Sequence, residues 1–192
     1  MPTLQPRRAG ILIPVFALRT PDDLGIGDIG GVRQLIDWSA DTGLGFVQFL
    51  PINATGSDSS PYNAISSVAL DYLTLELTPA AVPELDDKFH RTISSILRVD
   101  LLRHGSVNYP KVRRLKNTLL RRAFSQIESQ PERMAKFEAF CEKEASWLDD
   151  FCLFKVLMEE HGHEDWANWR EDLNTAAKAH AWGRDHLPAR LP

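Results

Sequence analysis

Near the start of the chain, two short apolar runs stand on either side of one amphipathic segment, and this order of elements limits the possible folds more than any other feature. The runs cover residues 10–16 and 46–51, and each predicts a short buried strand. Between them, residues 32–41 carry apolar side chains at helical spacing, and Gly43 stands where a glycine commonly ends a helix. Strands joined through a helix pair in parallel by a right-handed crossover. The sequence therefore predicts an α/β fold.

The rest of the chain changes character after a third apolar run. Residues 72–77 alternate apolar and polar side chains and stop before a proline, which predicts an edge or capping strand. From residue 84 onward the pattern is helical, and the longest helix is expected over residues 131–161, with Pro131 in its first turn and Gly162 at its end. We therefore divide the chain into residues 1–78, which hold the strands, and residues 79–192, which form a largely helical part.

The charge and polarity of the chain exclude several classes of partner. The net charge is -4, from 22 basic and 26 acidic residues spread along the chain, whereas nucleic-acid binding needs a basic face. The most basic stretch, residues 111–122, alternates charges with apolar residues and predicts a solvated helix face. No apolar run approaches about 18 residues and no basic-then-apolar leader opens the chain, so we expect neither a membrane partner nor export.

The two cysteines, Cys141 and Cys152, both fall within the helix predicted over residues 131–161. Their spacing on one helix separates them by roughly 16 Å along its axis, which is too far for a disulfide. We therefore expect two free thiols and a cytoplasmic protein.

The run from Gly25 to Gly30 satisfies the spacing G-x-G-x-x-G between a predicted strand and a predicted helix. This spacing is typical of dinucleotide sites. Three features argue against that function: the first strand ends several residues too early, Asp28 would face the pyrophosphate, and no acidic residue follows the second strand. We therefore interpret the run as a glycine-rich turn, with Asp28 near the N-terminus of the helix, where the dipole favours negative charge.

The loop after the second strand, residues 53–63, has the composition of a sugar site. It follows the carboxyl end of a strand in the predicted parallel pair, where α/β folds bind their ligands. Hydroxyl, amide and carboxylate groups in the loop suit sugar hydroxyls, and the ring of Tyr62 suits the apolar face of a sugar. A solvated turn explains the same composition, and both interpretations stay open at this point.

Two other groups of polar residues lack the spacing that catalysis or metal binding needs. His161 and His163 are two positions apart across a glycine, whereas two metal ligands on one helix face are four apart; the segment instead predicts a helix C-terminus. Asp149 and Asp150 are neighbours on the predicted helix and point about 100° apart, so they do not form a general acid/base pair. We expect no metal ion.

Several motifs occur in the order and at the spacing of one known family. They are Arg8-Ala9-Gly10-Ile11-Leu12, Leu24-Gly25-Ile26-Gly27-Asp28-Ile29-Gly30, Val47-Gln48-Phe49-Leu50-Pro51 and Ser60-Pro61-Tyr62, followed by Asn108-Tyr109-Pro110-Lys111-Val112 and Trp147-Leu148-Asp149-Asp150-Phe151. On these residues the chain resembles the N-terminal region of amylomaltases, the 4-α-glucanotransferases of glycoside hydrolase family 77, also called disproportionating enzymes. The most specific part is the glycine run followed by the serine-proline-tyrosine motif, and the resemblance covers nearly the whole chain.

The resemblance implies a fold and a chemistry. It implies a partial (β/α)8 TIM barrel with a largely helical insertion, in which residues 11–16 and 46–51 are the first two barrel strands. It also implies transfer of α-1,4-glucan segments between maltooligosaccharides by a retaining mechanism, with an aspartate nucleophile and a glutamate acid, and without a metal or organic cofactor. Within this chain, Tyr62, Ser60 and Asp28 match family positions that line the sugar subsites.

The catalytic motifs of the family are absent from this chain, since Asp185-His186 does not lie in an apolar strand. We therefore predict that the chain alone is inactive, and that its partners are an α-1,4-glucan and the missing C-terminal part of the same enzyme. Two alternatives stay open: a non-catalytic module that binds glucan or a partner protein, and a helical interaction domain over residues 84–161.

Overall fold

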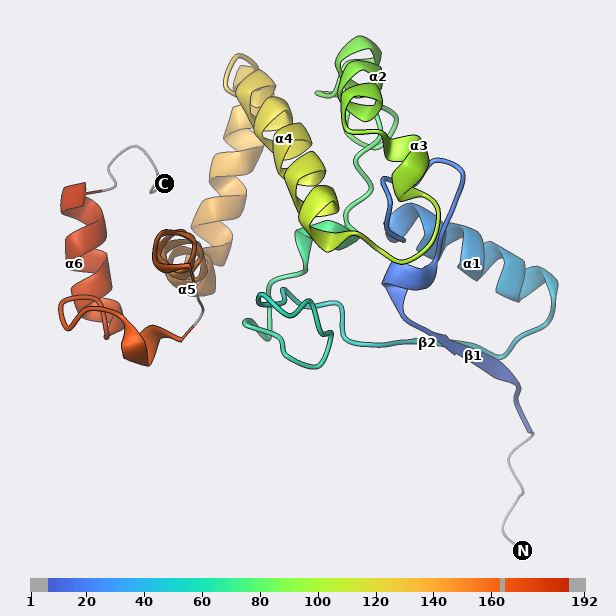
Figure 1. The fold of residues 1–192 in the computed structure, drawn as a ribbon, viewed down its shortest axis with the longest axis horizontal. Coiled ribbons are helices and arrows are strands. Elements are labelled where there is room, and N and C mark those ends of the chain that lie inside the picture. The colour runs from blue at the N-terminus through green and yellow to red at the C-terminus, as the bar shows by residue number, and fades with distance from the viewer. Residues whose placement is uncertain (1–6, 163–164, 187–192) are drawn as a thin grey trace, which may run out of the picture. The chain divides into compact units, whose positions relative to one another are not determined.

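The computed structural model describes residues 7–162 and 165–186 (Figure 1). The chain forms two compact units: unit 1 consists of Met1–Ile52 and Leu70–Gln126, and unit 2 consists of Asn53–Ala69 and Ile127–Pro192. These limits differ from the ranges 1–78 and 79–192, and that division stays a prediction. Among the described residues, no helix combines the length and the apolar character needed to cross a membrane.

The first two predicted strands form the sheet of unit 1. Strand β1 (Gly10–Ile13) pairs in parallel with strand β2 (Phe46–Phe49), with Gly10 opposite Phe46 and Ile13 opposite Phe49. Helix α1 (Ile29–Asp41) connects them along the chain, as Figure 1 shows. The predicted strand, helix and strand unit is confirmed, and the fold is α/β with a two-stranded sheet among the described residues.

The strands are shorter and less buried than the sequence predicts. Leu12 and Phe46 expose 57% and 50% of their surface, and a 3-10 helix, η1 (Val15–Ala17), replaces the end of the first predicted strand. The expectation of buried strands is wrong because buried parallel sheets need layers on both faces, and a sheet of two strands offers little surface for them. The assignment of these strands to a partial barrel stays a prediction.

Helix α1 begins and ends at the residues that its sequence signals indicate. The Asp28 side chain accepts hydrogen bonds from the first-turn N–H groups of Gly30 and Gly31, which the helix itself leaves without partners. At the other end the helix stops at Thr42, and Gly43 adopts a φ of +75°, a left-handed conformation that glycine accepts at no steric cost.

The third predicted strand is wrong, because the segment forms a 3-10 helix, η2 (Tyr72–Thr74). Asp71 starts this turn by accepting the N–H of Leu73 at 2.9 Å, and short aspartate side chains favour such turns over strands. The carbonyls of Leu73 and Leu75 then bond to the side chain of Lys116 instead of a neighbouring strand. Alternation of apolar residues does not report where the backbone groups find their partners.

Three helices complete unit 1: α2 (Asp87–Ile96), α3 (Val99–Leu102) and α4 (Tyr109–Ile127), the last of which extends by one residue into unit 2. Asp86 caps α2 by accepting the N–H of Phe89 at 2.7 Å. The main apolar core of the unit consists of Leu24, Leu77, Leu85, Val99, Leu102, Leu115, Leu119 and Ala123. The core thus draws on α3, α4 and the connecting segments, and not on the sheet.

Unit 2 contains the long helix α5 (Pro131–His161), a 3-10 helix η3 (Trp166–Asn168) and helix α6 (Ala176–His186). The predicted bounds of α5 are confirmed: Pro131 lies in its first turn, and Gly162 ends it with a φ of +73°. Cys141 and Cys152 are free thiols, as predicted. A separate apolar core consists of Leu153, Leu157, Trp169, Leu173 and Ala179.

Candidate functional site

The loop that the sequence predicts as a sugar site closes on itself through its backbone. The N–H of Ala54 donates to the carbonyl of Ala69 at 2.8 Å, and the N–H of Ile65 donates to the carbonyl of Ala54 at 2.8 Å. Thr55 and Ala64 form an antiparallel bridge just inside these contacts. The ends of the loop are therefore held together, and residues 56–63 form its tip within unit 2.

Asp58 organises the tip of this loop. Its Oδ1 accepts the N–H of Ser60 at 3.0 Å, and its Oδ2 accepts a hydrogen bond from the side-chain amide of Asn63. These two donors, first the Ser60 N–H and then the Asn63 amide, hold the pKa of Asp58 below its usual value because they stabilise the charged carboxylate. Ser59, at a φ of +56°, takes the left-handed conformation that the tight turn requires.

Ser60 and Tyr62 lie on the ordered part of this tip. The Oγ atom of Ser60 accepts the N–H of Tyr62 at 3.4 Å, which leaves the hydroxyl proton of Ser60 able to bond a ligand. Tyr62 is 72% exposed. An aromatic ring next to a hydroxyl donor is suited to a sugar, which has an apolar face and a polar edge. The roles of both residues stay predictions.

Asp28, the third predicted site residue, lies in unit 1 and has a different setting. It is buried, and its Oδ1 accepts the N–H groups of Gly30 and Gly31 at 2.9 and 3.3 Å. Burial raises the pKa of Asp28, although the positive charge of Lys116 and the two N–H groups act in the opposite direction. Its observed role is to cap α1, and its contact with a sugar stays a prediction.

The glycine run is a packing turn, as the sequence interpretation holds. A Cβ atom at Gly27 would lie 2.1 Å from the carbonyl oxygen of Val15, and one at Gly31 would lie 2.6 Å from the carbonyl oxygen of Leu18. Any larger residue would separate the start of α1 from the segment around η1. The first-turn N–H groups that would bind a pyrophosphate in a dinucleotide site bond to the side chain of Asp28 instead.

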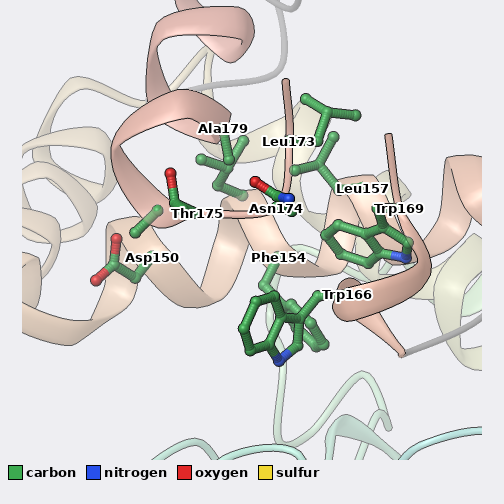
Figure 2. Close-up of a pocket in the computed structure, with 11 residues that line it drawn as sticks. Asp150, Phe154, Leu157, Trp166, Trp169, Leu173, Asn174, Thr175 and Ala179 are labelled. Carbon is green, nitrogen blue, oxygen red and sulfur yellow. The ribbon is translucent and has the colours of Figure 1, made fainter. Parts of the chain in front are cut away.

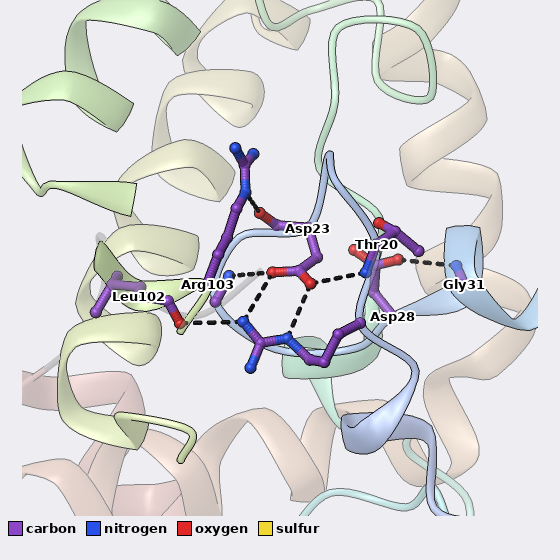
Figure 3. Close-up of polar contacts among 8 residues, drawn as sticks. Thr20, Asp23, Asp28, Gly31, Leu102 and Arg103 are labelled. Atoms are coloured by element: carbon purple, nitrogen blue, oxygen red, sulfur yellow. Dashed lines mark hydrogen bonds and ion pairs between the residues drawn. The ribbon is translucent and has the colours of Figure 1, made fainter. Parts of the chain in front are cut away.

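Asp23, which the sequence reasoning missed, fixes the loop that precedes the glycine run (Figure 3). Its carboxylate accepts hydrogen bonds from Arg19 Nε at 2.8 Å, the N–H of Thr20 at 2.9 Å and the N–H of Gly25 at 2.7 Å. Two arginines tie the loop to the end of α3: Arg19 donates to the carbonyl of Leu102 at 3.0 Å, and Arg103 donates to the carbonyl of Asp23 at 2.7 Å. A buried carboxylate with this many donors is fully compensated.

Lys116 departs from the solvated helix face that the sequence predicts over residues 111–122. It is completely buried, and its Nζ donates to the carbonyls of Leu73 and Leu75, both at 2.6 Å. Burial lowers its pKa to about 8, while the carboxylates of Asp28, Asp71 and Asp23 counteract that shift. A signal existed, because the buried positions of α4 recur at helical spacing: Val112, Leu115, Lys116, Leu119 and Ala123.

A polar cavity of about 400 Å³ lies beside Asp28 within unit 1. Glu76, which pairs with Arg33, contributes to its wall, together with His90 and Arg103. Burial lowers the pKa of His90, which favours the neutral ring. The remaining lining residues are Thr20, Asp22, Gly30, Gln34, Thr78, Pro79, Ala80 and Asp87.

His161, the last residue of α5, makes its contacts within the helix and with one neighbouring ring. The Nδ1 atom of His161 lies 2.9 Å from the carbonyl oxygen of Leu157, and its ring stacks on Trp169 with centroids 5.2 Å apart. His163 lies outside the described residues. In the part of the chain that the structure describes, no group of three or more His, Cys, Asp and Glu side chains is placed to hold a metal ion.

Comparison with known proteins decides the family. The model of the family described as 4-alpha-glucanotransferase (Glyco_hydro_77) matches residues 13–188 of this chain. The chain belongs to the 4-alpha-glucanotransferase family. This confirms the resemblance that the loop motifs and the glycine run indicate.

Individual 4-alpha-glucanotransferases match most of the chain. The one from Chlamydia muridarum is 32% identical over 181 residues, which is 92% of this chain and 34% of the relative. The one from Chlamydia caviae is 36% identical over 149 residues, which is 77% of this chain and 28% of the relative. The chain therefore spans about a third of the length of these relatives, and it corresponds to the N-terminal portion of a 4-alpha-glucanotransferase.

Solved amylomaltase structures have the same fold over the region they share with this chain. The amylomaltase from Streptococcus agalactiae in complex with acarbose superposes with a TM-score of 0.74 at 21% identity, covering 93% of this chain and 36% of that chain. The amylomaltase from Corynebacterium glutamicum gives a TM-score of 0.67 at 20% identity, covering 91% and 26%. At these identities the likeness establishes the fold alone.

Proposed function

We propose that this chain is the portion of a 4-α-glucanotransferase that holds the glucan, while the residues that break and form the glycosidic bond lie outside it. The observation that carries this proposal is the family match over residues 13–188, together with the ordered tip that presents Tyr62 and Ser60. The substrate would be an α-1,4-glucan, whose segments are moved between maltooligosaccharides. The acarbose bound to the amylomaltase from Streptococcus agalactiae supports a sugar-like ligand for this fold.

A retaining transfer needs two carboxyl groups about 5–5.5 Å apart, one as nucleophile and one as acid. Four candidate carboxylates from the first part of the chain already have structural partners. Asp28 caps α1, Asp58 holds the loop tip, Asp71 accepts the N–H of Leu73, and Glu76 pairs with Arg33. A carboxylate committed to such bonds is a poor nucleophile, which supports an inactive chain.

The role proposed for the loop is to position the glucan. An exposed ring offers stacking to one sugar unit, and the Ser60 hydroxyl offers a hydrogen bond to the same unit or its neighbour. Groups of this kind bind the ground state and the transition state alike, so they lower the concentration of sugar needed without lowering the chemical barrier. We also propose that β1 and β2 are the first strands of a (β/α)8 barrel, completed by the rest of the enzyme.

The test is incubation of the purified chain with maltotriose, with products separated by chromatography. We expect no glucose and no longer maltooligosaccharides, together with measurable binding of maltotriose that the Tyr62→Ala variant weakens. Disproportionation of maltotriose by the isolated chain would contradict the proposed division of roles. Equal binding by the parent chain and the Tyr62→Ala variant would remove the loop from the sugar site.

A further inference from the structure

Unit 2 contains a second cavity, which shares no lining residue with the loop of Ser60 and Tyr62. It has a volume of about 410 Å³, within the range of small-molecule sites. Its wall includes residues of the apolar core of the unit, among them Leu157, Leu173 and Ala179, as Figure 2 shows. We call it the α5–α6 cavity, and its complete lining is Asp150, Leu153, Phe154, Leu157, Trp166, Trp169, Leu173, Asn174, Thr175, Ala176 and Ala179.

Trp166 lines this cavity, and it is largely exposed to solvent. It is 55% exposed, and it has no ring contact among the residues that the structure describes. The other tryptophans of unit 2 are engaged: Trp147 lies against Phe151, Trp169 stacks on Phe154, and Trp182 stacks on His186. The turn of η3 fixes the backbone of Trp166, because the N–H of Trp169 donates to its carbonyl at 3.2 Å. An indole exposed and held in this way is suited to stacking on a ligand.

Polar groups line the same cavity. Asp150 Oδ1 bonds to Nε2 of His180 at 2.6 Å, which leaves its Oδ2 as an acceptor. Thr175 Oγ accepts the N–H of Lys178 at 3.4 Å, so the hydroxyl proton is still available as a donor. Asn174 Oδ1 accepts from Nζ of Lys178 at 3.3 Å, which leaves the two amide hydrogens as donors.

This combination selects a class of ligand. A hydrocarbon would cover the apolar wall of the cavity but would make no use of Asp150, Asn174 and Thr175, which lie at its exposed rim. A carboxylate ligand would be repelled by the carboxylate of Asp150. An ammonium ligand would be repelled by the charge of Lys178 and would face the donor groups of Asn174 and Thr175. A neutral ring with hydroxyl groups satisfies both kinds of group, and its apolar face can cover Trp166.

We propose that the α5–α6 cavity binds one glucosyl unit of an α-1,4-glucan, with the sugar face on Trp166 and its hydroxyls toward Asp150, Asn174 and Thr175. The choice of glucan among neutral sugars rests on the function proposed above. The cavity gives the enzyme a second hold on a long glucan, in addition to the loop of Ser60 and Tyr62. A maltooligosaccharide long enough to reach both sites at once would therefore bind better than a single sugar.

The test is a titration of the 15N-labelled chain with maltotriose, following the indole N–H signals by NMR. The Trp166→Phe variant assigns the signal of Trp166, and Trp38 serves as the matched control, because it is similarly exposed, at 51%, on α1 of unit 1. We expect maltotriose to shift the Trp166 signal and to leave the Trp38 signal in place. Removing the ring in Trp166→Ala should weaken the saturable binding at this cavity about tenfold, whereas Trp166→Phe retains most of it.

A second pair of variants tests the polar groups. Asp150→Ala should weaken the response of Trp166, whereas Asp149→Ala, on the neighbouring position of α5, should not. An unmoved Trp166 signal, or a response to indole in place of maltotriose, would overturn the proposal. The Tyr62→Ala variant separates the two sites: a Trp166 shift that persists in it assigns sugar binding to the cavity even if the loop binds none.

Discussion

Asp28 and Asp58 make the same local contact in two different settings. Each carboxylate accepts the backbone N–H of the residue two positions further on, Gly30 for Asp28 and Ser60 for Asp58. Asp28 is buried, and desolvation raises its pKa, whereas Asp58 is exposed, and its hydrogen bonds lower its pKa. One short motif therefore produces opposite shifts, because desolvation dominates in one place and hydrogen bonding in the other.

The two regions differ in what their polar groups do: those around Asp28 support the fold, and those around Asp58 hold a loop whose side chains are exposed. Around Asp28, buried charged groups bond to the backbone. Lys116 donates to the carbonyl of Leu73, and Asp23 accepts the N–H of Gly25, so these backbone groups are not left without partners. Around Asp58, the same bonds stiffen a loop whose ring and hydroxyl stay available to solvent. Substitutions in the first region should change stability, and substitutions in the second should change sugar binding.

The largest effect is expected from Lys116→Met, which keeps the length of the side chain but removes its charge and its donors. The carbonyls of Leu73 and Leu75 lose their partner, and three buried carboxylates lose a neighbouring cation. We expect a loss of about 3–5 kcal/mol in the free energy of unfolding, measured by urea denaturation. Lys111→Met, on an exposed position of α4, is the control and should change stability by less than about 0.5 kcal/mol.

The next effect is a dependence on pH. Because the pKa of Lys116 is about 8 in the folded chain and 10.5 for an ordinary lysine, the unfolded chain binds more protons between these values, and folding stability rises with pH in that window. The gain over the whole window is up to about 3 kcal/mol. Urea midpoints at several pH values should show this rise in the parent chain relative to Lys116→Met, and parallel curves for the two would contradict the low pKa.

A smaller loss of stability is expected from Asp28→Ala, which removes the cap of α1. The N–H groups of Gly30 and Gly31 then lack their acceptor, at a cost of about 1–2 kcal/mol. Asp28→Asn should cost less, because an asparagine oxygen caps a helix equally well. Thermal unfolding of the two variants separates the cap from the charge, and equal losses would show that the carboxylate charge itself stabilises the fold.

The smallest effect on stability is expected at the loop tip. Tyr62→Ala should leave the thermal midpoint unchanged within error, because the ring contacts solvent, and should weaken maltotriose binding. Asp58→Ala should also weaken binding, because the tip loses the acceptor that orders Ser60 and Asn63. A drop in the midpoint as large as that of Asp28→Ala would show that the loop belongs to the folded core and would end the distinction between the two regions.

The sequence predicts those elements whose signals are local. Asp28 and Gly43 give the ends of α1, Pro131 and Gly162 give those of α5, and the strands β1 and β2 follow from apolar runs. Each of these signals acts through a few neighbouring backbone groups. The glycine run is also interpretable, because its spacing conflicts with a dinucleotide site.

What the sequence does not predict depends on contacts far apart in the chain. The alternation of residues 72–77 indicates a strand, but Lys116, far along the chain, takes the carbonyls of that segment. The burial of Lys116 is equally non-local, because a lysine shortly after Arg113 and Arg114 suggests a solvated face until its acceptors are known. The α5–α6 cavity likewise forms only where α5, η3 and α6 pack together, so no local sequence pattern predicts it.

Backbone hydrogen bonds at its two ends make the segment Asn53–Ala69 a replaceable insert. The loop is stitched by Ala54, Ala69 and Ile65, and the backbone of Ile52 is joined to that of Asp71 at 2.9 Å just outside it. A chain that leaves and re-enters at one point tolerates replacement of what lies between. Exchange of this segment for that of a relative should therefore leave the backbone contacts on either side of it in place.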